Sequence, residues 1–219
     1  FDMYFHPEEM AKLAVDTGFR VVLLSGLSNF NSSLQELEEC YRKYNHFHPL
    51  VSYQLGFHAE YTTSKPLLEG IAKLAREFQA PVFTHNSETK GEVEGCLSRY
   101  GMTPTALMDS LGMLQYGGGG YHCVEMTDGD LDIFQKRGMT VITNPASNMK
   151  LASGVPRTAD ILARGIPMAI GTDGPASNNC LDMFREMFLV TGLSKLREKD
   201  AAAVPAEEVL RMACVNGAR

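Results

Sequence analysis

The sequence predicts an α/β protein built around a parallel sheet, either an open doubly wound sheet or a (β/α) barrel. Short apolar runs rich in β-branched residues alternate with amphipathic stretches along the 219 residues, and no run of hairpins interrupts them. This alternation favours parallel strands covered by helices. No glycine-rich dinucleotide or phosphate fingerprint follows the first apolar run, which weakens the nucleotide-binding open sheet.

Six apolar runs are predicted as strands because each is short and bounded by Gly, Pro, Ser or Asn. They are residues 21–24, 50–57, 81–84, 121–124, 140–143 and 167–171. The glycine run 117–120 is predicted as a flexible loop or turn, since it precedes a strand and does not open a helix.

Helices are predicted for the amphipathic stretches between these runs. Apolar side chains recur at helical spacing in residues 34–44, with charged residues between them. Residues 64–78 begin with Ser64 as an N-cap and place Pro66 near the first turn. The remaining predicted helices are residues 130–136, 157–163 and 181–196.

Composition narrows the functional class. A hydrophobic content of 44% can form one substantial core, so residues 1–219 are predicted to be a single domain. Twenty Lys and Arg against 26 Asp and Glu argue against a nucleic-acid-binding protein, although a nucleoside substrate stays open. No apolar run approaches the roughly 18 residues of a membrane span. The five scattered cysteines predict neither a disulfide framework nor a cysteine zinc site, and they favour the cytoplasm.

Four of the predicted strands run into a polar side chain able to do chemistry. These side chains are His58, His85, His122 and Asp173, and Glu88 follows shortly after His85. In a parallel α/β barrel the carboxyl ends of the strands meet at one face, where active sites assemble. Three histidines and an aspartate at that face predict a divalent metal, because neutral imidazole and carboxylate oxygen suit zinc or ferrous iron.

Each of these residues also has an ordinary structural interpretation. A lone histidine at a strand end is more often a hydrogen-bonded structural residue. Glu88 alone would be a solvated or helix-N-terminal carboxylate, and Asp173 in a Gly-Thr-Asp-Gly segment would form a turn. A common site is favoured because four of the predicted strands end at side chains of this kind: His58, His85, His122 and Asp173.

Two other histidine patterns are set aside. His46 and His48 form an H-x-H pair, but the pair precedes the predicted strand 50–57 and would lie on the opposite face of a barrel. His58 and Glu60 match half of the cytidine-deaminase zinc signature, whose P-C-x-x-C half is absent from the sequence.

Longer motifs carry a family resemblance. They are DMYF at 2–5, GFHAEYTTS at 56–64, THNSET at 84–89, YHCVEMTD at 121–128, NPASNMKLASG at 144–154 and GTDGPASNNCLDM at 171–183. Through these motifs the chain resembles the amidohydrolase superfamily, in particular the 5-methylthioadenosine/S-adenosylhomocysteine deaminases and their chlorohydrolase relatives. The resemblance covers nearly the whole chain and implies a distorted (β/α)8 TIM-type barrel with one catalytic zinc or iron ion.

The resemblance also implies roles for individual residues. His85 and Asp173 are expected to bind the metal, and Asp173 to act as the general base as well. Glu88 is expected to hold the purine ring and carry a proton to its ring nitrogen. His122 is expected to polarise or hydrogen-bond the attacking water.

Three further expectations concern residues near the substrate. His58 is expected to contact the ribose. Ser177, in the turn after Asp173, is a weaker candidate for contact with the substrate or with a metal ligand. Asn144 and Asn148 are expected to brace the rim of the barrel.

The reaction implied is hydrolytic deamination of an adenine nucleoside, namely methylthioadenosine, adenosine or S-adenosylhomocysteine, to the inosine-type product and ammonia. A divalent metal brings the pKa of water down to about 7, and an acidic glutamate can protonate the ring. Zn²⁺ is expected first, with Fe²⁺ as the alternative. Alternative functions are a guanine or 8-oxopurine deaminase, a triazine chlorohydrolase, and a catalytically inactive barrel fragment.

Two departures from the family pattern add expectations. The H-x-H of the family's first strand has no counterpart, so the barrel is expected to be truncated at both ends relative to the family and to contain about strands 2–8. By itself the chain is expected to bind metal weakly and to turn over little or nothing, and its exposed strand edges favour association into a homo-oligomer. The loop at residues 25–33 contains no Arg or Lys to hold an amino-acid carboxylate. Methylthioadenosine or adenosine is therefore expected to be preferred over S-adenosylhomocysteine.

Overall fold

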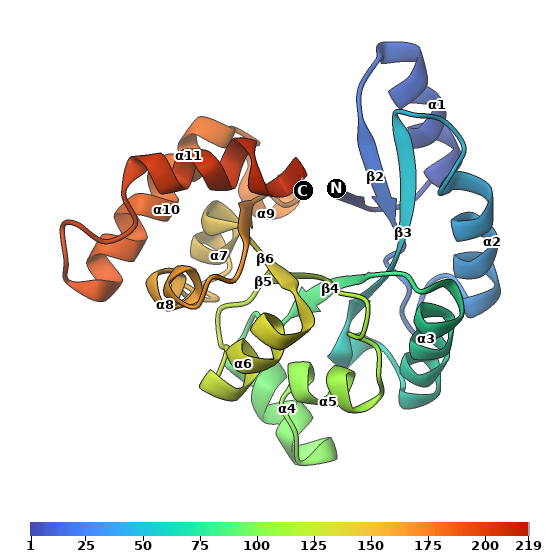
Figure 1. Ribbon diagram of the computed structural model, residues 1–219, viewed down its shortest axis with the longest axis horizontal. Helices are drawn as coiled ribbons and strands as arrows, with labels where there is room; N and C mark the ends of the chain where they lie inside the picture. Colours follow the sequence, from blue (N-terminus) through green and yellow to red (C-terminus); the bar gives the residue numbers. More distant parts are fainter. Residues whose placement is uncertain (219) are drawn as a thin grey trace. The chain divides into compact units, whose positions relative to one another are not determined.

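A computed structural model describes residues 1–218 (Figure 1). The chain divides into two compact units, which we describe in turn. The first comprises Phe1–His85 and Leu107–Gly118, and the second comprises Asn86–Ala106 and the residues from Gly119 onward.

The first unit is built on four parallel strands that neighbour one another in chain order. They are β1 (Asp2–Met3), β2 (Val21–Leu24), β3 (Val51–Ala59) and β4 (Val82–Asn86), the last of which ends in the second unit. The connecting helices are α1 (Pro7–Thr17), α2 (Leu34–Tyr44) and α3 (Lys65–Phe78), with a 3-10 turn at Glu60–Thr62. The parallel pairing with helical crossovers is the predicted arrangement.

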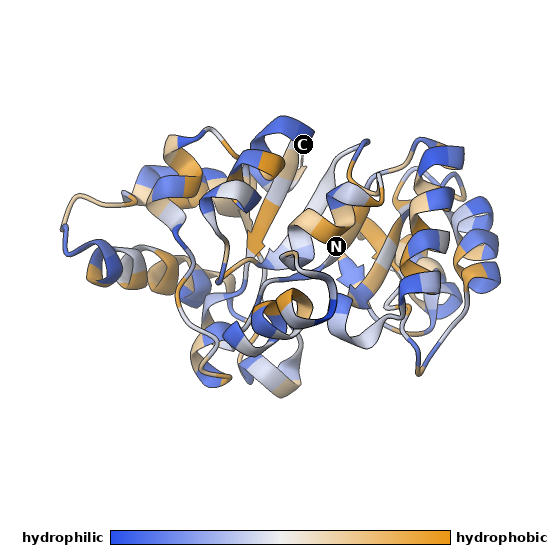
Figure 2. Cartoon of the chain, turned by 90° about the horizontal axis from the view of Figure 1, so that it is seen from below, coloured by the Kyte–Doolittle hydropathy of each residue, from blue (hydrophilic) through white to orange (hydrophobic). Residues whose placement is uncertain are grey.

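Local signals explain where these helices begin and what they bury. Ser33 caps α2 by accepting a hydrogen bond from the backbone N–H of Glu36. Helix α2 packs on β3 and on α3 (Figure 1). The ring of Tyr41 on α2 stacks on that of Phe78 on α3, with centroids 4.6 Å apart. The strands are mainly hydrophobic, whereas the helices alternate hydrophilic and hydrophobic residues (Figure 2).

The second unit contains the strands β5 (Gly118–His122), β6 (Met139–Thr143) and β7 (Met168–Ile170), again neighbours in chain order. Strands β6 and β7 pair in parallel, with Val141 opposite Met168. The helices are α4 (Lys90–Tyr100), α5 (Pro104–Ser110), α6 (Asp128–Arg137), α7 (Pro145–Lys150), α8 (Thr158–Ala163), α9 (Pro175–Asn178), α10 (Met183–Glu198) and α11 (Ala206–Cys214), and a 3-10 turn follows at Asn216–Ala218. Helix α5 continues into the first unit.

One prediction about the chain is wrong. The glycine run 117–120 is not a loop: β5 begins at Gly118, and the strand predicted at 121–124 ends at His122. The reason is close backbone approach, because Val82 donates a hydrogen bond from its N–H to the carbonyl of Gly117. Gly118 has a φ of +130°, and a Cβ there would lie 1.9 Å from the carbonyl oxygen of Val82. Only a residue without a side chain fits this position.

Within the described residues, none of the helices has the length and apolar composition required to cross a membrane.

We expect Gly118→Ala to lower the free energy of unfolding by more than about 3 kcal/mol, because backbone strain and the clash with Val82 add together. Gly18→Ala is the matched control, since Gly18 has a φ of +72° but a Cβ at this position would meet nothing within 4 Å. The control is expected to lose only about 1 kcal/mol. Urea denaturation of both variants measures the difference, and equal losses would contradict the close-approach explanation.

Candidate active site

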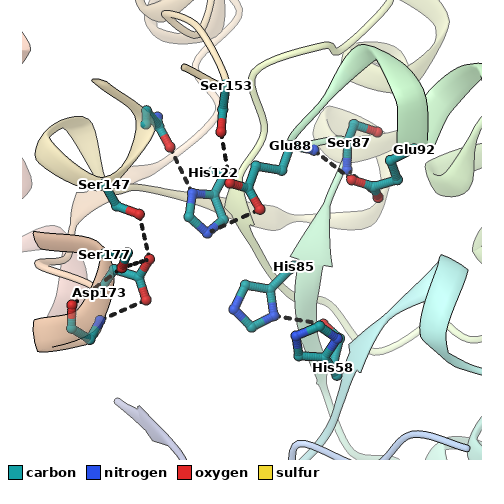
Figure 3. Close-up of polar contacts among 12 residues, drawn as sticks. His58, His85, Ser87, Glu88, Glu92, His122, Ser147, Ser153, Asp173 and Ser177 are labelled. Atoms are coloured by element: carbon teal, nitrogen blue, oxygen red, sulfur yellow. Dashed lines mark hydrogen bonds and ion pairs between the residues drawn. The ribbon is translucent and has the colours of Figure 1, made fainter. Parts of the chain in front are cut away.

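The predicted site residues lie at or just beyond the carboxyl ends of strands (Figure 3). His58 lies inside β3, one residue before its end, because this strand is longer than predicted. His85 is the last residue but one of β4, and His122 is the last residue of β5. Asp173 follows β7 by three residues. The first unit therefore holds His58 and His85, and the second holds Glu88, His122 and Asp173.

In the first unit a backbone carbonyl fixes the ring of His85. Its Nδ1 atom lies 2.6 Å from the carbonyl oxygen of His58. A carbonyl oxygen only accepts hydrogen bonds, so Nδ1 carries the hydrogen and Nε2 carries the lone pair of the neutral ring. This is the form in which an imidazole binds a metal ion. The side chain of His58 in turn contacts Thr62, with 2.9 Å between Nδ1 and Oγ1.

In the second unit the carboxylate of Asp173 accepts three hydrogen bonds. Ser147 and Ser177 donate their hydroxyls to Oδ2 at 2.6 and 2.7 Å, and the N–H of Gly174 donates to Oδ1 at 2.7 Å (Figure 3). Burial by itself would raise the pKa of Asp173, but these hydrogen bonds outweigh it and lower the pKa below its ordinary value. Asp173 is therefore charged at neutral pH.

His122 and Glu88 face each other in the same unit. The Nε2 atom of His122 lies 3.8 Å from Oε2 of Glu88, and its Nδ1 atom lies 2.7 Å from the amide oxygen of Asn148 (Figure 3). Since that oxygen accepts, Nδ1 donates and Nε2 faces the carboxylate. Ser153 donates to the other oxygen of Glu88 at 2.8 Å. The carboxylate of Glu88 and the ring of His122 thus face each other across a short gap and belong to one polar cluster.

A second carboxylate, Glu92, supports the turn that carries Glu88. Glu92 is only 5% exposed and accepts hydrogen bonds from the backbone N–H groups of Ser87 and Glu88 at 2.9 and 2.8 Å. Thr89 caps α4 by accepting from the N–H of Glu92. Burial, with a smaller contribution from the neighbouring charge of Glu88, raises the pKa of Glu92 to about 7 despite the backbone hydrogen bonds.

Sequence reasoning missed several of these supporting residues. Ser147 and Ser153 belong to the motif at 144–154, but nothing in their spacing indicates that they bond Asp173 and Glu88. The motif predicts Asn148 only as a brace of the rim, whereas its side chain contacts His122 directly. A detectable signal existed for Glu92, because Thr89 and Glu92 have the T-x-x-E spacing of a capping box.

The donor set for a metal is only partial. Between residues 1 and 218, no group of three or more His, Cys, Asp or Glu side chains is placed to hold a metal ion. The decoy histidines His46 and His48 follow α2 and precede β3, as predicted for the pair.

Comparison with known proteins identifies the family. The amidohydrolase family model matches residues 1–219. A 5-methylthioadenosine/S-adenosylhomocysteine deaminase of Pyrococcus furiosus is 41% identical, with coverage of 100% of this chain and 54% of the relative. A 5'-deoxyadenosine deaminase of Methanothermobacter thermautotrophicus is 39% identical, with coverage of 100% and 53%. The chain thus spans about half the length of the curated relatives it matches.

A solved structure matches the fold of this chain. The crystal structure of an adenosine deaminase from Xanthomonas campestris with bound zinc matches with a TM-score of 0.93 and 32% identity. The match covers 99% of this chain and 51% of that one. It confirms the predicted fold class, a β/α barrel, for the strands that the chain contains.

We expect the stability of the protein to depend on Glu92 between pH 4.5 and about 7. A raised pKa means that the folded state binds the proton more tightly than the unfolded state, so the contribution is fully present below pH 4.5 and is lost as the pH rises through 7. Relative to Glu92→Gln, the wild-type free energy of unfolding is expected to fall by about 3 kcal/mol over this range. Urea denaturation at several pH values measures it.

The control for this experiment is Glu69→Gln, because the side chain of Glu69 on α3 is 55% exposed. Its difference from wild type is expected to stay constant with pH. A Glu92→Gln difference that is equally constant would contradict the raised pKa.

Proposed function

The chain belongs to the amidohydrolase family, and from this premise we propose that it performs metal-dependent hydrolytic deamination of an adenine nucleoside. The substrates proposed are methylthioadenosine, adenosine and S-adenosylhomocysteine, and the products are the inosine-type nucleoside and ammonia. The observation that carries the proposal is that Glu88 and His122 face each other, with 3.8 Å between Oε2 and Nε2, in the unit that also holds the charged Asp173. The relatives named for adenine nucleosides support it.

His85 in the first unit and Asp173 in the second are each proposed as a ligand of a divalent metal, with Zn²⁺ as the first choice and Fe²⁺ as the alternative. Their chemistry fits such an ion, because the Nε2 atom of His85 carries the ring's lone pair and Asp173 is charged. When bound, the ion supplies the Lewis acidity that makes water a nucleophile near neutral pH. The zinc in the adenosine deaminase structure supports the choice of metal.

The remaining steps are assigned to side chains of the chain itself. Asp173, as a charged carboxylate, accepts a proton from the attacking water. Glu88 delivers a proton to the purine ring nitrogen as water adds to the carbon that bears the amino group. His122, whose ring is held by Asn148, is assigned to polarise or hydrogen-bond the attacking water. Asp173 then passes the proton that it took from water to the amino group, which leaves as ammonia. As the carbonyl of the product forms, the hydroxyl proton of the adduct returns to Glu88, so that one water is consumed and one ammonia is released.

The surroundings of the reaction are proposed in the same way. His58 in the first unit would contact the ribose, and Ser177 would act through its hydrogen bond to Asp173. The net charge of −6 favours a small-molecule partner over nucleic acid or a membrane surface. The five free thiols favour the cytoplasm, and association into a homo-oligomer is part of the proposal.

We expect Glu88→Gln to lower kcat for ammonia release from methylthioadenosine by 10²- to 10⁴-fold, roughly the contribution of a general acid. The isosteric amide keeps the hydrogen bond from Ser153 but cannot deliver the proton. A coupled ammonia assay on the full-length protein measures the change. The control is Glu94→Gln on α4, the helix that follows Glu88; the side chain of Glu94 is 63% exposed and paired with Lys90. Equal activity of the two variants would remove Glu88 from the mechanism.

We also expect methylthioadenosine to have a kcat/KM at least about 10-fold above that of S-adenosylhomocysteine, because no cation is offered to the amino-acid carboxylate by loop 25–33. Several polar side chains of this loop are already engaged in hydrogen bonds: Ser28 donates to Asn31 at 2.7 Å, and Ser25 accepts from the N–H of Leu27. Steady-state kinetics on the full-length protein with both substrates provide the measurement. Equal values for the two substrates would refute the preference.

A further inference from the structure

A fully buried carboxylate lies behind the site and has no role in the steps above. Glu186, on α10, is 0% exposed. Its Oε2 atom accepts a hydrogen bond from the backbone N–H of Ala146 at 3.0 Å, and its Oε1 atom accepts one from the side-chain amide of Asn178 at 2.8 Å. The two oxygens of one carboxylate therefore join α7 to α9.

Each of the two joined residues is next to a serine that bonds Asp173. Ala146 precedes Ser147, and Asn178 follows Ser177. Both serine hydroxyls donate to the same oxygen of Asp173, at 2.6 and 2.7 Å. Glu186 is thus connected to Asp173 by two separate routes, one through each serine.

Asn178 strengthens this connection. Besides its bond to Glu186, its amide donates to the carbonyl of Thr172 at 2.6 Å, directly before Asp173 in the chain. Its side-chain oxygen accepts from the N–H groups of Cys180 and Leu181. Asn178 is 2% exposed, so its polar atoms depend on these partners instead of on water.

Helices α7 and α9 depend on such contacts because they are short. They contain six and four residues, too few for a helix to be stable without tertiary packing. Helix α10, which carries Glu186, has 16 residues and packs against α7, α8, α11 and β7. Helix α10 is therefore the stable element of the three, and the carboxylate of its Glu186 sets where α7 and α9 lie.

The carboxylate of Glu186 serves to position the groups that it bonds more than to stabilise the folded protein. A buried charge contributes little net stability, and an apolar side chain of similar volume often serves as well. An apolar side chain, however, would accept no hydrogen bond and would leave Ala146 and Asn178 free to choose other positions. Fixing two donors at once is what a carboxylate adds.

We propose that Glu186 is a positioning residue that orients Asp173 for catalysis through Ser147 and Ser177. The role rests on the proposed function in so far as Asp173 is the base of that reaction. The hydrogen-bonded link between Glu186 and the two short helices holds whatever the reaction is.

The first test is Glu186→Gln in the full-length protein, an isosteric change that leaves one oxygen to serve two donors. We expect kcat for methylthioadenosine to fall 10- to 100-fold, the usual size of effects of residues that support a site ligand. KM is expected to change less than about 3-fold, because the substrate contacts are not altered.

The matched control is Asp130→Asn. Asp130 on α6 is also buried, at 1% exposed, and accepts hydrogen bonds from Thr127 and Thr103. Its replacement is expected to lower the melting temperature but to leave kcat within about 2-fold. An equal loss of kcat in both variants would show that Glu186 acts only through general stability, and would overturn the proposal.

A double-mutant cycle tests the route. If Glu186 acts through the two serines, its replacement in a Ser147→Ala/Ser177→Ala background is expected to cost less than about 2-fold in kcat. A full 10- to 100-fold loss in that background would overturn the proposal. Asn178→Ala, which removes one of the two donors, is the second variant and is expected to lower kcat in the same direction with KM unchanged.

A final measurement does not depend on activity. Hydrogen exchange followed by mass spectrometry is expected to show faster exchange at both 145–150 and 173–178 in Glu186→Gln, and at neither in Asp130→Asn. Unchanged exchange at either segment would overturn the proposal. If the wild type released no ammonia, the proposed function would fail, and this exchange result would still decide whether Glu186 links the two segments.

Discussion

A carboxylate taken out of water must find hydrogen-bond donors, and much of the second unit is arranged to meet this requirement. Glu92 takes its donors from the backbone of the turn after β4, and Glu186 takes its donors from α7 and α9. Each buried acid lies behind a less buried one, Glu92 behind Glu88 and Glu186 behind Asp173. The inner acids fix the backbone, and the outer ones, Glu88 and Asp173, are those to which the proposed function assigns chemical roles.

The backbone conformation near these carboxylates reflects the same need for hydrogen-bond donors. Ser87, His122 and Asp173 are non-glycine residues with φ values of +50°, +65° and +60°. Such conformations are costly and persist only where the surroundings over-determine them. Here the surroundings are the hydrogen bonds to Glu92, Asn148 and the two serines, so the network that satisfies the buried acids also holds the turns in strained shapes. That combination is typical of a site in which geometry is fixed before a substrate arrives.

The sequence predicts regular elements well and irregular ones poorly, for physical reasons. The strand 21–24 and the helix 34–44 match the structure to the residue, because their apolar periodicity is complete. Helices α7 and α9 are too short to show a period, and Gly91 and Gly95 weaken the helical pattern of α4. The glycine run is misleading because glycine is favoured both in flexible loops and where two backbones come close together, and the sequence alone does not separate the two cases. The polar strand ends are visible in the sequence, but their partners are not, since hydrogen bonds that join residues 26 or 65 positions apart leave no local pattern.

Substrate choice within this family must be decided away from the reacting atoms. The relatives and the solved structure are named for methylthioadenosine, S-adenosylhomocysteine, 5'-deoxyadenosine and adenosine, which share the adenine ring and differ in the group at the 5' carbon. In the proposed reaction Glu88 and His122 would act on the adenine ring, which all of these compounds share, and would not distinguish them. Discrimination therefore requires residues that reach the 5' group, where a charged amino-acid tail needs a cation and a methylthio or deoxy group needs an apolar surface. Loop 25–33 contains no Arg or Lys, and Ser28 in it is bonded to Asn31, so the loop offers no such cation. This absence of a cation is the physical reason for the proposed preference against S-adenosylhomocysteine.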